Sequence, residues 1–102
     1  MNNIVILQMP FFKRSYKKLH AKERLYVDKA IQVLAKKPTL GELKKGDLAA
    51  VFVYKFKIYN QLMLLAYEYS AETLTLLAIG PHENFYRDLK NNKFSRQQVE
   101  IQ

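Results

Sequence analysis

The spacing of apolar residues changes along the chain, and its first part predicts a short strand followed by a helix. Residues 4–7 form an apolar run typical of a strand. Pro10 follows at a point where a helix can begin, because the first helical turn does not need the N–H that proline lacks. Over 11–19, apolar side chains recur at i, i+4 and i+7, which places them on one helical face: Phe12, Tyr16 and Leu19.

A second helix is predicted over 22–36, after a tight connection at His20. Pro38 ends it, and lysines fill its last turn, where the helix dipole favours cations. Its expected buried face consists of Val27, Ala30, Ile31 and Leu34. Two antiparallel helices joined this closely need a sheet to cover their apolar side.

Beyond the loop expected over 39–47, the apolar period becomes two, which is typical of a strand with two different faces. Turns at 59–61 and 70–72 then connect strands predicted over 62–69 and 73–79. In the strand with this period, over 51–58, aromatic and aliphatic residues (Phe52, Tyr54, Phe56 and Ile58) alternate with Val51, Val53, Lys55 and Lys57. One face is therefore expected to join the core, and the other becomes cationic.

The block from Gly80 to Arg87 gathers a histidine, an aromatic hydroxyl and an arginine after an apolar strand. Gly80 and Pro81 are poor strand residues, so we expect the strand to end at Ile79 in a sharp turn. A short helix is predicted over 83–91, followed by a tail, about 92–102, that is mobile or ordered by a partner. The predicted fold class is α+β, a helical hairpin packed on a small antiparallel sheet.

Length and composition point to one domain over residues 1–102. Hydrophobic residues make up 49% of the chain, and no apolar run approaches the roughly 20 residues of a membrane span. The apolar start lacks the basic leader of a signal peptide. Cysteine is absent, which is compatible with a reducing compartment. We therefore expect a cytoplasmic protein without membrane contact.

The net charge of +8 attracts polyanions, so nucleic acid is the leading class of partner. Many of the lysines and arginines have a simpler explanation as the solvated faces of the two helices. That explanation is weaker for Lys55 and Lys57, because they lie within a strand pattern.

The order of elements and three short segments resemble the RelE/ParE superfamily of bacterial type II toxins. The segments are Leu43 to Leu48, Tyr54 to Lys57, and Gly80 to Tyr86. The resemblance extends from the first strand to about Lys90. It implies an antiparallel sheet with the helical hairpin on one face, and a cognate antitoxin protein as partner.

RelE-like members cut mRNA on the ribosome, and the resemblance implies roles for particular residues. In that reaction the 2′-hydroxyl attacks the adjacent phosphate, which requires a base, cations and an acid for the leaving oxygen, with no metal or other cofactor. Lys55 and Lys57 match the family's lysine pair, and repulsion between them favours proton loss from one. His82 would serve as general acid. Tyr86 would stack on a base, and phosphate contacts would come from Arg87, Lys44 or Lys45.

Two sequence features limit this interpretation. RelE-like members carry an arginine in the strand after the lysine pair, and Leu64 takes that place here. His82-Glu83 begins a zinc-protease pattern, but the fifth residue is Tyr86, so the pattern fails.

Three functions remain open at this point. The first is a ribosome-dependent mRNA endoribonuclease, favoured by the lysine pair together with His82 and Tyr86. The second is a ParE-like inhibitor of DNA gyrase that acts by binding, which the missing strand arginine favours. The third is a binding module that recruits only an antitoxin or nucleic acid.

Overall fold

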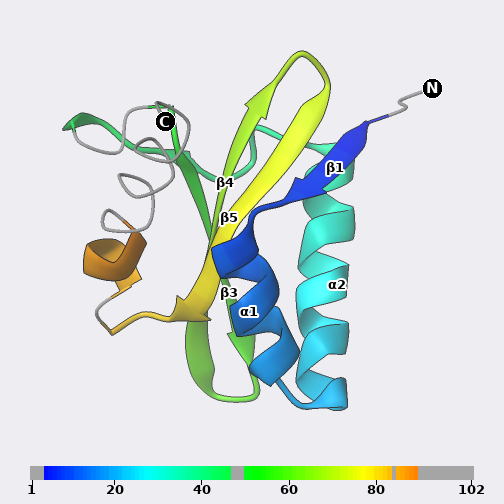
Figure 1. The fold of residues 1–102 in the computed structure, drawn as a ribbon, viewed down its shortest axis with the longest axis vertical. Coiled ribbons are helices and arrows are strands. Elements are labelled where there is room, and N and C mark those ends of the chain that lie inside the picture. Colours follow the sequence, from blue (N-terminus) through cyan, green and yellow to red (C-terminus); the bar gives the residue numbers. More distant parts are fainter. Residues whose placement is uncertain (1–3, 47–49, 84, 90–102) are drawn as a thin grey trace.

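A computed structural model describes residues 4–46, 50–83 and 85–89, and in it two helices pack on a five-stranded sheet (Figure 1). The helices are α1 (Pro10–Lys18) and α2 (Ala21–Lys36). The sheet order is β1-β5-β4-β3-β2. The strands are β1 (Val5–Gln8), β2 (Glu42–Leu43), β3 (Phe52–Ile58), β4 (Gln61–Ser70) and β5 (Thr73–Pro81). The predicted α+β class is confirmed.

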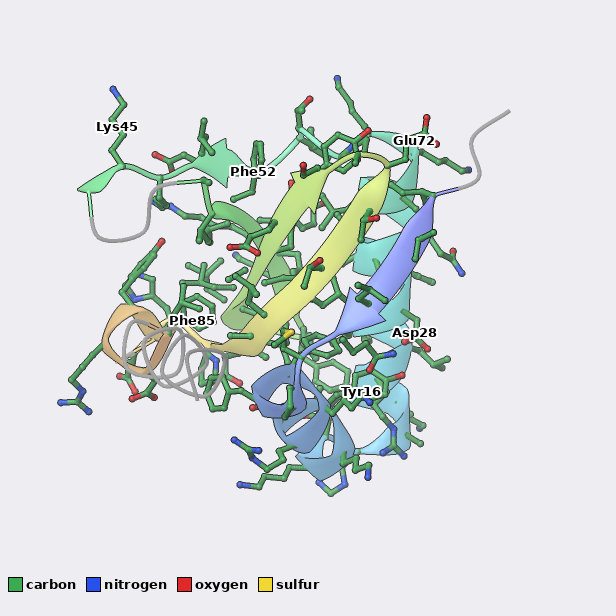
Figure 2. The ribbon with its side chains drawn as sticks, turned by 45° about the horizontal axis from the view of Figure 1, so that its top comes forward. Tyr16, Asp28, Lys45, Phe52, Glu72 and Phe85 are labelled. Carbon is green, nitrogen blue, oxygen red and sulfur yellow. The ribbon has the colours of Figure 1, made fainter. Side chains whose placement is uncertain are left out.

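The helical hairpin forms as its apolar spacing predicts. Phe12 is fully buried, and Tyr16 and Leu19 pack beside it against the core. The Tyr16 hydroxyl donates a hydrogen bond of 2.7 Å to Asp28 of α2, and Figure 2 shows the two side chains meeting. At the start of α2, the Glu23 carboxylate accepts a hydrogen bond from the His20 N–H (2.8 Å), which satisfies a donor that the first turn leaves free.

The sheet has two distinct faces, and the period-two pattern of β3 assigns its side chains to them correctly. Phe52, Tyr54 and Phe56 pack against the core cluster that the helical hairpin covers. Val51 and Val53 belong to a second apolar cluster on the opposite face, which also contains Leu64, Ala66, Leu77, Ala78, Phe85 and Leu89. A short helical segment at 85–89 covers this second face, on the side of the sheet away from α1 and α2 (Figure 1).

Three features of the sheet differ from the sequence prediction. The sheet is mixed, because β1 pairs in parallel with β5 while the other pairs are antiparallel. The expected loop at 39–47 contains β2, which pairs with the start of β3. Strand β5 does not end at Ile79 but continues through Gly80 and Pro81.

The continuation of β5 through proline has a geometric reason. The His82 N–H donates to the Leu62 carbonyl of β4 (3.3 Å), and successive residues of a strand direct their backbone groups to opposite sides. The nitrogen of Pro81 therefore faces away from β4. On that side β1 pairs only as far as Leu76, so proline removes no hydrogen bond of the ladder.

The buried side chain of Tyr67 fixes the segment that leads into β2. Its hydroxyl donates to the Pro38 carbonyl (2.6 Å) and accepts from the Gly41 N–H (2.9 Å). A Cβ at position 41 would lie 2.7 Å from this oxygen, so the close approach requires glycine. Burial raises the pKa of the Tyr67 phenol.

Candidate functional site

The lysine pair lies on the sheet face opposite the helical hairpin. Lys55 and Lys57 are exposed on β3, while Val53 on the same face is buried under the short helical segment. Two positions along a strand separate their Cα atoms by about 7 Å. The structure thus confirms that one face of β3 changes from apolar to cationic along its length.

His82 lies in the same cross-strand row as Lys57. Lys57 pairs directly with Leu62 of β4. On the other side of β4, the Leu62 carbonyl accepts a hydrogen bond from the His82 N–H. Two strand spacings separate the Cα atoms of Lys57 and His82 by about 10 Å. Both side chains are exposed, and the half-buried Leu62 stands between them in the row.

Tyr86 belongs to a second group at the β2 end of the same face. The Lys44 ammonium lies 5.1 Å from the centre of the Tyr86 ring and 3.1 Å from the Glu42 carboxylate. The hydrogen bond to Glu42 is the main cause of a raised pKa at Lys44, and Tyr86 adds to it. The Tyr86 ring also meets Phe85 edge to face. The Lys44 N–H donates to the carbonyl of Val51, the residue before β3. Val51 precedes Lys57 by six residues, so about 20 Å of extended chain separates the two.

Arg87 and Lys45, the other candidate phosphate ligands, are exposed. The Arg87 guanidinium lies 3.9 Å from the Asp88 carboxylate of the following residue. Figure 2 shows Lys45 pointing away from the sheet at the end of the β2 segment. Neither side chain is directed toward the row of Lys57 and His82 by any contact within the described residues.

Leu64 stands at the place of the family's strand arginine and is fully buried. It pairs with Lys55 on one side and Gly80 on the other, and it packs with Phe85 and Leu89. The centre of this face is therefore apolar and covered. Among the described residues, positive charge lies at the margins of this face, from Lys44 at one end and from Lys55 and Lys57 toward the other.

Two further observations concern metals and membranes. Within ranges 4–46, 50–83 and 85–89, no three His, Asp or Glu side chains gather where they could hold a metal ion. In the same part of the chain, no helix has the length and apolarity needed to cross a bilayer.

The fold and the sequence together define a family. Residues 6–90 match the model of the ParE-like toxins of type II bacterial toxin–antitoxin systems, so the chain belongs to this family. The predicted family resemblance is thereby confirmed. No curated protein sequence matches the chain.

Solved structures of the E. coli toxin RelE share the fold. A double-arginine mutant of RelE in the free state superposes with a TM-score of 0.68, at 15% identity over 91% of this chain and 96% of RelE. The intact E. coli RelBE toxin–antitoxin complex gives 0.64, at 15% identity over 78% and 98%. The isolated E. coli RelE toxin gives 0.62, at 14% identity over 86% and 97%.

Sequence reasoning missed the residues that position Lys44. Glu42 holds its ammonium, and the contact of Tyr67 with Gly41 fixes the approach to β2, 26 positions earlier in the chain. The only local signal is a glycine shortly after Pro38, and it does not identify its distant partner.

Proposed function

We propose that this toxin cleaves mRNA on the ribosome and thereby inhibits translation and growth. The observation that carries the proposal is the row formed by Lys57, Leu62 and His82, which brings an ammonium and an imidazole to an exposed margin of one sheet face. The fold shared with RelE supports it.

In the proposed reaction, the RNA 2′-oxygen forms a bond to the adjacent phosphorus and the bond from phosphorus to the 5′-oxygen breaks. Lys55 or Lys57, in its neutral form, takes the 2′-hydroxyl proton, while the other ammonium stabilises the phosphorane charge. His82 donates a proton to the leaving 5′-oxygen. The products are a 2′,3′-cyclic phosphate and a free 5′-hydroxyl.

The remaining predicted residues have supporting roles in this proposal. Arg87 and Lys45 attract the RNA backbone, and Lys44 shares that role although Glu42 offsets part of its charge. Tyr86 stacks on an unpaired base after the base displaces Lys44 from the ring face that it contacts.

We further propose that a cognate antitoxin neutralises the protein, as the RelBE complex is a toxin bound to its antitoxin. Inhibition of DNA gyrase is the second candidate function. The buried Leu64 favours it, because the apolar centre of the face offers no strand cation to a scissile phosphate.

Growth arrest after induction separates these candidates when it is measured beside plasmid supercoiling. Cleavage predicts that His82→Ala, and the double change Lys55→Ala with Lys57→Ala, relieve arrest while supercoiling stays normal in every strain. Matched controls are Lys17→Ala on α1 and His20→Asn, which retains a helix-capping side chain. Arrest with loss of supercoiling in the His82→Ala strain would instead establish gyrase inhibition.

A further inference from the structure

Strand β1 forms one edge of the sheet, because the strand order gives it a partner on one side only (Figure 1). Its three aliphatic side chains are exposed, at 52% for Val5, 39% for Ile6 and 50% for Leu7. Edge strands commonly carry a charge, a proline or a bulge that discourages pairing with another chain. Residues 4–8 contain no charged residue and no proline, and β1 pairs with β5 in unbroken register.

The backbone groups that face this edge can be assigned. The N–H groups of Val5 and Met9 donate to carbonyls of β5 and of the residue before it, at 2.9 Å in each case. Because the direction alternates along a strand, Ile4, Ile6 and Gln8 direct their N–H and C=O groups outward. Within the described residues no strand lies beyond them. The edge therefore presents a row of groups to which a further strand can bond.

Both faces of β1 are apolar. Ile4 packs against the core that the helical hairpin covers, so Ile6 lies on that face, whereas Val5 and Leu7 lie on the opposite face. A chain with a net charge of +8 repels its own copies over much of its surface. At β1 a second copy meets no like charge, since the strand reads Val-Ile-Leu-Gln.

We propose that β1 mediates self-association: the β1 strands of two copies pair antiparallel about a two-fold axis at Ile6 and join the two sheets into one. Ile6 then exchanges two hydrogen bonds with Ile6 of the second copy, and Ile4 pairs with Gln8 of the second copy. On the other face, Val5 packs on Leu7 of the second copy at both sides of the axis. A pairing of this kind uses the same surface on both copies, so it closes at a dimer.

The size and charge of this contact predict how the dimer behaves. A seam of one short strand is small beside the roughly 800 Å² per partner of a stable complex, so association should depend on concentration. Salt should strengthen it, because screening weakens the repulsion between two cationic chains. The inference does not rest on the proposed function, since Lys57 and His82 lie away from β1 and remain accessible in the dimer.

Sedimentation velocity of the full chain from about 1 μM to about 1 mM measures the association. The monomer should give way to a dimer as concentration rises. Val5→Lys with Leu7→Lys should weaken dimerisation at least about tenfold, because like charges then face each other. Val5→Glu with Leu7→Lys should retain the dimer, since each introduced glutamate then lies opposite an introduced lysine of the second copy.

The matched control for the lysine variant is Leu40→Lys with Leu43→Lys, near β2 at the far edge of the sheet. These side chains are 42% and 53% exposed, and their replacement changes the net charge equally. Dimerisation should then change less than about twofold.

Cysteine cross-linking tests the register, because the native chain contains no cysteine. Ile6→Cys should yield a disulfide-linked dimer on oxidation, since the two Cα atoms at the axis lie about 5.5 Å apart. Gln8→Cys is the control, because its two copies would lie about 14 Å apart and should not cross-link.

Several results would overturn the proposal. A monomer throughout the concentration series, or a dimer that salt weakens, contradicts an apolar seam between cationic chains. An equal loss in the Leu40 and Leu43 variant places the contact elsewhere. A monomeric Val5→Glu, Leu7→Lys variant, or equal cross-linking of the two cysteine variants, contradicts the antiparallel pairing about Ile6.

Discussion

The substitution Tyr67→Phe tests whether a single buried hydroxyl holds the approach to β2. It removes the donor to Pro38 and the acceptor for Gly41 and keeps the aromatic ring, which stacks on Phe52 at 5.2 Å. A typical hydrogen bond contributes about 1 kcal/mol, and a buried group left without a partner costs about 1 to 3 kcal/mol. We therefore expect the free energy of unfolding to fall by about 2 kcal/mol.

Urea denaturation followed by circular dichroism measures this change, with Tyr69→Phe as the matched control. Tyr69 stands two residues further along β4, beside the same core cluster, and its hydroxyl has no hydrogen-bond partner within the described residues. A loss of about 2 kcal/mol corresponds to a decrease in Tm of about 10 °C for a chain of this size. Equal, small effects of the two substitutions would refute the role assigned to the Tyr67 hydroxyl.

Three further predictions concern the packing of Leu64, the turn at Glu72 and the ionisation of Tyr67. Leu64→Ala should lower the unfolding free energy by about 3 kcal/mol, because it opens a cavity beneath the segment 85–89, and a loss below about 1 kcal/mol in urea denaturation would contradict that packing. Glu72→Gly should stabilise the protein by about 1 kcal/mol, since φ is 61° at this turn position, and an unchanged or lower denaturation midpoint would argue against backbone strain there. Burial raises the pKa of Tyr67 above 10.0, so the unfolded state loses the phenol proton at a lower pH than the folded state does. The stability that is present below pH 10 should therefore decline as the pH rises further, by up to about 1.4 kcal/mol per pH unit. Tyr67→Phe should reduce that slope in denaturation curves measured between pH 9 and about 11, and identical slopes would contradict the assignment.

The pattern of the sequence predicts those elements whose burial is regular. The alternation in β3 correctly separates Phe52, Tyr54 and Phe56 from Lys55 and Lys57, because neighbouring strand residues face opposite sides. The helices are predicted to within one residue at each end, since their apolar stripes pack on the sheet.

Features that depend on distant contacts were not predictable. Strand β2 exists because Tyr67 fixes Gly41, and two paired residues leave no periodic pattern. Pro81 can remain in β5 because β1 pairs with β5 only as far as Leu76. The residues next to Pro81 in the sequence do not indicate where that pairing ends. The contact between Lys44 and Tyr86 likewise joins residues 42 positions apart, so sequence could name both as candidates without placing them together.

The most direct test of the central claim is the mapping of mRNA 5′ ends after induction of the toxin. If Lys57 and His82 take part in RNA cleavage as proposed, new 5′-hydroxyl ends should arise within translated mRNA. These ends should be lost with His82→Ala and retained with His20→Asn, and both variant proteins should remain folded by circular dichroism. Growth arrest without new ends, or the same ends in the His82→Ala strain, would contradict the account.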